Sequence, residues 1–70
     1  MPGVSGIEHK RAVRALQPAG FRVARQGKHI PMADGERIVT ISRADPINGH
    51  TMAGILNDAS ISAEQFRDLL

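Results

Sequence analysis

Residues 28–42 read KHIPMADGERIVTIS, and within them two short apolar runs flank the dipeptide Asp34-Gly35. Asp-Gly tolerates the positive backbone dihedrals that a two-residue hairpin turn requires. The β-branched run at residues 38–41 suits a strand paired with residues 29–33. Apolar and polar residues alternate within residues 21–26, and Gly27 separates this run from the next one. The sequence therefore predicts a three-stranded antiparallel meander with strands near residues 21–26, 28–33 and 37–42.

A helical pattern precedes the predicted sheet. Ser5 and Glu8 fit a capping box, which predicts a helix that starts near Ser5 and ends before Gly20. Residues of its apolar stripe recur at the spacing of one helical face, and they are His9, Ala12, Val13 and Leu16. The helix can therefore cover the sheet while its basic residues point elsewhere.

Two further helices are predicted after the sheet. Asn48 is a candidate cap for a helix that runs to about Ala59. Ser62 and Gln65 repeat the capping-box pattern and predict a short final helix. We expect the apolar residues of this last helix to close the core, with a dimer contact as the alternative, and they are Phe66, Leu69 and Leu70.

The predicted elements follow the order α-β-β-β-α, with a short extra C-terminal helix. Three strands have one face to bury, and the helices before and after them are the available cover. We therefore expect an α+β fold, a two-layer sandwich in which helices cover one face of a three-stranded antiparallel sheet. A chain of 70 residues cannot support two cores, so residues 1–70 are expected to form a single domain.

The composition limits both the core and the chemistry of the protein. Apolar residues make up 41% of the chain, but Trp and Tyr are absent and there are only two Phe, so the core must be mainly aliphatic. The absence of Cys excludes disulfides, a thiolate nucleophile and Cys-containing zinc sites. No apolar run approaches the roughly 20 residues of a membrane span, and no signal peptide is evident. We expect a soluble, cytoplasmic protein without a membrane partner.

The basic residues are unevenly distributed along the chain. Residues 9–29 contain six Lys and Arg and no acid, namely Lys10, Arg11, Arg14, Arg22, Arg25 and Lys28. Such clustering favours positive potential on one end of the molecule, where a polyanion could bind. A solvated basic helix face is the alternative explanation, and charge alone does not separate the two.

Three histidines are candidates for acid-base chemistry near neutral pH. His9 lies on the predicted buried stripe and His50 in the first turn of a helix, so both are interpreted as structural. If Ile30 and Met32 face the helices, strand alternation places His29 on the open face of the sheet. Gly27 permits close approach of a phosphate, which Lys28 and Arg25 could hold beside the ring. This arrangement suits phosphodiester chemistry.

The sequence shows no pattern typical of a metal or cofactor site. It contains no His-x-x-x-His pair, no Asp and Glu ligand cluster and no Gly-rich nucleotide-binding loop. No nucleophile elbow is present either. We therefore expect no metal and no cofactor.

Three segments resemble HicA-family toxins, also called YcfA-like proteins. They read GFRVARQGKH at residues 20–29, PINGHTMAGI at residues 46–55 and SAEQFRDL at residues 62–69. The resemblance rests on four features in this order. They are a Gly-Phe after the first helix, a Gly-x-His at the start of the second strand, a short third strand, and a helix that begins with a polar-Thr-apolar sequence. The resemblance covers nearly the whole chain.

This resemblance implies a fold like the double-stranded-RNA-binding domain and the activity of a metal-independent mRNA interferase, the toxin of a type II toxin-antitoxin system. It implies a HicB-like antitoxin as the protein partner and mRNA as the substrate. The family's catalytic histidine matches His29 in the step Gly27-Lys28-His29. Many members have Gly-Ser-His at this step, so Lys28 replaces a serine here.

We therefore predict an endoribonuclease in which neutral His29 takes the proton of an RNA 2′-OH, which attacks the adjacent phosphodiester. Lys28 and Arg25 would stabilise the charge that develops on the phosphorane. Lys10 and Arg14 would position the RNA backbone without reading its sequence. In this hypothesis the four cations form the RNA-binding residues and His29 the catalytic one.

Two other functions remain open from the sequence. The same order of elements and the basic first half would also suit an RNA-binding module without catalysis. A protein-interaction domain is the second alternative, because the apolar residues of the three strands cannot all share one face in every register. Those residues are Phe21, Val23, Ile30, Met32, Ile38, Val39 and Ile41.

Overall fold

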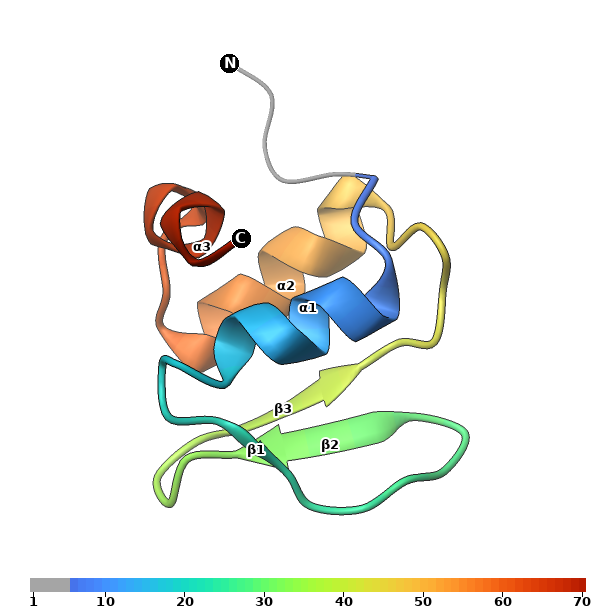
Figure 1. Ribbon diagram of the computed structural model, residues 1–70, viewed down its shortest axis with the longest axis vertical. Coiled ribbons are helices and arrows are strands. Elements are labelled where there is room, and N and C mark those ends of the chain that lie inside the picture. The colour runs from blue at the N-terminus through green and yellow to red at the C-terminus, as the bar shows by residue number, and fades with distance from the viewer. Residues whose placement is uncertain (1–5) are drawn as a thin grey trace.

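The computed structural model describes residues 6–70, which form a three-stranded sheet with helices on one side (Figure 1). The elements follow the predicted order, and the α+β architecture is confirmed. In chain order they are α1 (His9–Leu16), β1 (Arg22–Val23), β2 (Ile30–Ala33), β3 (Ile38–Ile41), α2 (Gly49–Ala59) and α3 (Ala63–Leu69). Helices α1 and α2 lie over the same face of the sheet, and α3 packs against both of them.

The sheet is an antiparallel meander in the order β1-β2-β3. Met32 pairs with Val23 on one side and with Val39 on the other, and these side chains face the helices. Ile38 pairs with Ala33 and points to the open face, where it is 71% exposed. The register therefore resolves the conflict among the apolar strand residues by leaving Ile38 on the outer surface.

All three strands are shorter than the sequence pattern predicted. β1 comprises only Arg22 and Val23, and β2 begins at Ile30 rather than at Lys28. Residues 24–29 instead form an exposed connection between β1 and β2. Polar and small residues dominate this connection, so it gains little from burial within a sheet.

The β2–β3 hairpin forms where the sequence predicted it, but its turn lies one residue further along the chain. The backbone N–H of Asp34 donates to the carbonyl of Arg37 at 3.2 Å, so Gly35 and Glu36 are the two central residues. Gly35 alone has a positive φ, of 98°. The Asp34 carboxylate accepts from the backbone N–H groups of Glu36 and Arg37, at 2.9 and 2.7 Å. Asp34 thus contributes its side chain to the turn rather than a left-handed backbone.

Helix α1 begins at His9, so the prediction of a start near Ser5 was wrong; Ser5 itself lies outside the described residues. Gly6 has a positive φ of 72°, which is incompatible with helix, and Ile7 forms an isolated bridge with Ile47. The side chain of the capping residue Glu8 makes no capping hydrogen bond. The chain therefore enters α1 from an extended conformation.

The caps predicted for the other two helices are present. Asn48 Oδ1 accepts from the backbone N–H of Thr51 at 2.8 Å at the start of α2. At the start of α3, Ser62 and Gln65 form a reciprocal capping box, with distances of 2.9 and 3.0 Å. Each side chain satisfies a backbone donor that the first helical turn leaves free.

The core lies between the sheet and the helices. Its largest fully buried side chains come from every layer and are Phe21, Phe66, Leu16, Met32, Ile41, Ile47, Met52 and Val39. Of the three residues expected to close the core, Phe66 is fully buried, Leu69 packs at its edge and Leu70 is exposed. Within residues 6–70, no helix is both long and apolar enough to cross a membrane.

Candidate functional site

His29 is exposed and lies in a bend one residue before β2, not within the strand as predicted. It lines an open hollow of about 440 Å³ on the outer side of the sheet. We call this the loop hollow, and its lining residues are Arg25, Gln26, Gly27, Lys28, His29, Pro31 and Thr40. The structure thus brings His29 together with Lys28 and Arg25, the two cations that the sequence placed beside it.

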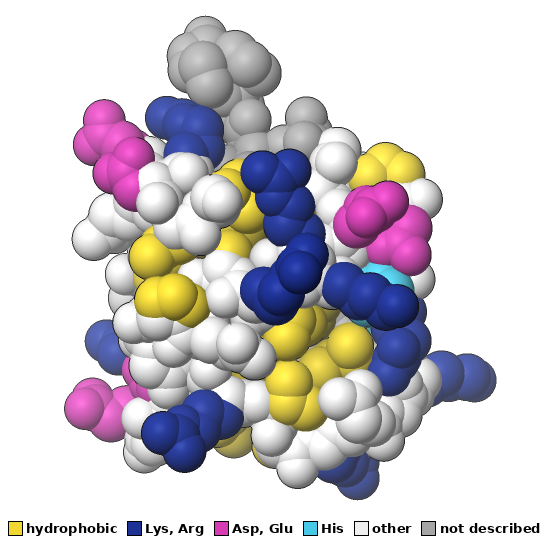
Figure 2. All heavy atoms as spheres, viewed as in Figure 1, with side chains coloured by type: hydrophobic (Ala, Val, Ile, Leu, Met, Phe, Trp, Pro, Cys, Tyr) yellow, Lys and Arg dark blue, Asp and Glu magenta, His cyan; other side chains and the backbone are white. Residues whose placement is uncertain are grey.

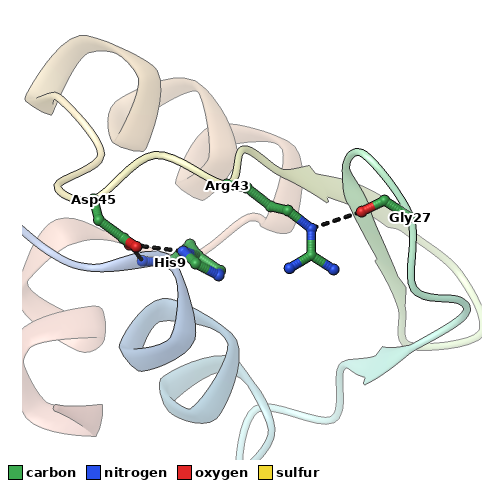
Figure 3. Close-up of polar contacts among 4 residues, drawn as sticks. All are labelled: His9, Gly27, Arg43 and Asp45. Carbon is green, nitrogen blue, oxygen red and sulfur yellow. Dashed lines mark hydrogen bonds and ion pairs between the residues drawn. The ribbon is translucent and has the colours of Figure 1, made fainter.

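Arg43 holds the connection that carries these residues. Its Nε donates to the carbonyl of Gly27 at 2.6 Å (Figure 3), and its Nη2 donates to Gln26 Oε1 at 3.0 Å. The hairpin register explains this contact. Ile30 pairs with Ile41, and if the same antiparallel pairing is continued for two more residues, position 43 lies opposite position 28, next to Gly27. The sequence analysis assigned no role to Arg43, although the hairpin register could have indicated its position.

Lys10 and Arg14 do not line the loop hollow. They border a second open hollow of about 370 Å³ between α1 and the sheet. We call this the α1 hollow, and its lining residues are His9, Lys10, Val13, Arg14, Val23, Gln26, Ile30 and Arg43. Gln26 lines both hollows, so they are neighbours. The four predicted RNA-binding cations are therefore divided between two adjacent hollows.

The surface beside α1 combines an apolar floor with a cationic border. Figure 2 shows a hydrophobic patch flanked by Lys and Arg side chains, with a histidine at its edge. The floor is formed by Val13, Val23 and Ile30, of which the two valines are half-buried. No Asp or Glu is among the residues that line this hollow. The hollow therefore offers both apolar contact and attraction for an anion.

His9 is only 8% exposed, in agreement with its predicted place on the buried stripe of the first helix. Its ring Nδ1 lies 2.6 Å from Asp45 Oδ1, and its backbone N–H donates to the same oxygen at 2.9 Å (Figure 3). These bonds hold the pKa of Asp45 below its usual value, the backbone bond contributing most and the ring second. Because Asp45 is ionised near neutral pH, Nδ1 must carry the proton of this short contact.

The Asp45 contact fixes the orientation of the His9 ring. Figure 3 shows the second ring nitrogen turned away from Asp45, on the side where Arg43 lies. Nε2 therefore belongs to the α1 hollow, where a neutral ring presents it as an acceptor. Sequence reasoning did not find this pair, because its members are separated by 36 positions.

The remaining candidates contribute less to either hollow. His50 is exposed on the first turn of α2 and lines neither the loop hollow nor the α1 hollow. Across residues 6–70, no group of three or more His, Asp or Glu is arranged to hold a metal ion. Comparison of the chain with family models, with curated proteins and with solved structures gave no match.

Proposed function

We propose that the protein is an endoribonuclease toxin of a type II toxin-antitoxin pair, similar to the HicA family, with His29 as its general base. The observation that carries this proposal is the loop hollow, in which an exposed imidazole shares one surface with Arg25 and Lys28. Two hydrogen bonds from Arg43 anchor the connection that presents all three. An unpacked histidine between cations suits attack on a phosphodiester better than it suits a structural role.

The reaction is an intramolecular transfer within RNA. The neutral His29 ring accepts the proton of a 2′-OH, and the 2′-oxygen forms a bond to the adjacent phosphorus. The bond from phosphorus to the 5′-oxygen then breaks, and that oxygen takes a proton from the imidazolium. Lys28 and Arg25 stabilise the charge on the phosphoryl oxygens. The products are a 2′,3′-cyclic phosphate and a 5′-hydroxyl, and neither a metal nor a cofactor takes part.

The surroundings of the loop hollow support the choice of partners. Lys10 and Arg14 border the adjacent α1 hollow, where they attract the RNA backbone beyond the reacting phosphate. On the outer sheet face, Pro31 lines the loop hollow and the apolar side chain of Ile38 is 71% exposed. A HicB-like antitoxin that covered Ile38 would also obstruct the loop hollow. The protein would act in the cytoplasm, on mRNA.

One observation favours the alternative of an RNA-binding module without catalysis. Within residues 6–70, the His29 side chain has no hydrogen-bond partner that would orient its ring, whereas His9 has one in Asp45. The cations of both hollows would serve such a module equally well. The fold that the family resemblance implies, similar to the double-stranded-RNA-binding domain, is compatible with either function.

End-group analysis of RNA treated in the presence of a chelator separates these functions. The proposal predicts fragments that end in a 2′,3′-cyclic phosphate and begin with a 5′-hydroxyl. A matched RNA with 2′-deoxyribose at the cleaved position should bind but remain intact, because it lacks the attacking oxygen. RNA that binds without being cut would contradict the enzyme and support the binding module. Cleavage of the 2′-deoxy substrate would contradict the proposed mechanism.

A further inference from the structure

The α1 hollow has features that cleavage at His29 does not require. Its floor is aliphatic, its border carries Lys10, Arg14 and Arg43, and one edge is the oriented ring of His9. A phosphate backbone alone would need the cations but not the floor. The combination instead fits a ligand that has an anionic end and a flat, weakly polar body.

We propose that the α1 hollow binds one unpaired nucleotide, with its phosphate at the cationic border and its base on the aliphatic floor. That the nucleotide belongs to an RNA strand rests on the proposed function. The hollow of about 370 Å³ falls within the range of roughly 300–1,000 Å³ that is usual for small-molecule sites. Gln26 lines both hollows, so this one is adjacent to the loop hollow.

The three cations of the border come from two segments, α1 and the residues that follow β3. Lys10 and Arg14 are four residues apart on α1, so they project from the same face of the helix. Arg43 approaches from the end of β3, and two of its five N–H donors are engaged by Gly27 and Gln26. These bonds immobilise the guanidinium before any ligand arrives, which lowers the entropic cost of binding. Its remaining donors are left for the phosphate.

The aliphatic floor provides the surface on which the base lies. Val13 on α1 and Val23 on β1 are half-buried, and Ile30 behind them is buried, so the hollow offers an apolar surface. Nucleobases extruded from a helix are held against aromatic or apolar side chains and read by hydrogen bonds at their edges. The His9 Nε2 acceptor and the Gln26 amide supply polar groups at this edge. Both faces of a paired base are stacked on its neighbours in a duplex, so only an unpaired base can place a face on this floor.

Titration of ¹⁵N-labelled protein with adenosine 5′-monophosphate, inorganic phosphate and adenosine tests this assignment by NMR. We expect saturable shifts in α1 and residues 22–26, with the mononucleotide binding at least about tenfold more tightly than either fragment. Arg14→Gln should weaken binding, whereas Arg67→Gln on α3 serves as a matched control and should not. Val23→Thr, which keeps the volume but adds a hydroxyl, should weaken the mononucleotide more than phosphate.

Three results would overturn the proposal. Inorganic phosphate could bind as tightly as the mononucleotide, Arg14→Gln could behave like Arg67→Gln, or the shifts could centre on residues 27–29. The dispersion of the NMR spectrum shows whether each variant remains folded. Mononucleotide binding by a protein that never cleaves RNA would refute the proposed endoribonuclease and leave this site established. Cleavage of RNA without mononucleotide binding would refute the site in the α1 hollow and leave the proposed endoribonuclease standing.

Discussion

The Asp45 carboxylate, in the loop after β3, accepts hydrogen bonds from both the backbone N–H and the ring Nδ1 of His9. His9 is the first residue of α1, so Asp45 satisfies one of the free backbone donors at the start of that helix. It does so from a distance of 36 residues. The bridge between Ile7 and Ile47 lies beside this contact in the sequence and joins the same two segments. Together they tie the entry of α1 to the entry of α2.

Removing the Asp45 carboxylate should destabilise the protein through α1. We expect Asp45→Ala to lower the melting temperature, because the His9 ring and backbone N–H lose their shared acceptor. Asp45→Asn should lower it less, since the amide oxygen can still accept. Asp58→Ala, which removes an exposed carboxylate on α2, is the control. Equal melting temperatures for Asp45→Ala and Asp58→Ala would contradict this role.

Stability should also depend on the ionisation of Asp45. Its folded-state pKa lies below the ordinary value of 3.8, chiefly because of the backbone bond from His9. The unfolded chain therefore binds the proton more readily, so the stabilisation is fully present well above pH 3.8 and is lost as pH falls through the lower folded-state pKa. In denaturant unfolding, the wild type should have a larger free energy of unfolding than Asp45→Asn, and this advantage should shrink below pH 3.8. An advantage that is constant with pH would count against this account.

Phe66 should carry most of the contribution of α3 to the core. It is fully buried, and Phe→Ala changes at such sites cost about 3–5 kcal/mol. That loss is a large part of the roughly 5–15 kcal/mol that stabilises a typical domain. We expect Phe66→Ala to be largely unfolded at 37 °C by circular dichroism. Ile38→Thr should change stability by less than about 0.5 kcal/mol, because Ile38 is exposed on the outer sheet face.

Arg43 should control the order of the connection before β2. Arg43→Gln removes the bonds to Gly27 and Gln26, so heteronuclear NOE values at residues 25–29 should fall. Arg43→Lys should not restore them, because an ammonium lacks the planar fork that reaches both acceptors. Arg11→Gln on the exposed side of α1 is the control. NOE values unchanged in Arg43→Gln would show that other contacts hold this connection.

Local features of the fold could be predicted from the sequence, because their causes lie within a few residues. Asn48 and Ser62 cap the helices that follow them through bonds to neighbouring backbone groups. Gly35 marks the hairpin because a positive φ is needed there. Each of these preferences acts over a short range and agrees with the fold as a whole. The conflict among the apolar strand residues was visible in the sequence, but the register that leaves Ile38 outside came from the structure.

Features that join distant segments could not be predicted in this way. The start of α1 was misplaced because its capping carboxylate comes from Asp45, which no local pattern indicates. Lys10 and Arg14 were expected to position the RNA backbone, but no local pattern indicated that they border a hollow separate from that of His29. Arg43 has no local sequence signal, and its contact with Gly27 can be anticipated only once the register of β2 and β3 is known. Such contacts depend on tertiary packing.

Single-turnover cleavage and binding of one RNA by His29→Ala, with His50→Ala as the matched control, test the proposed endoribonuclease most directly. Both histidines are exposed, but only His29 lines the loop hollow. Loss of a general base predicts a rate about 10²- to 10⁴-fold lower for His29→Ala, with RNA affinity retained. His50→Ala should cleave at the wild-type rate. Cleavage by His29→Ala at the wild-type rate would contradict the assignment of His29 as the catalytic residue.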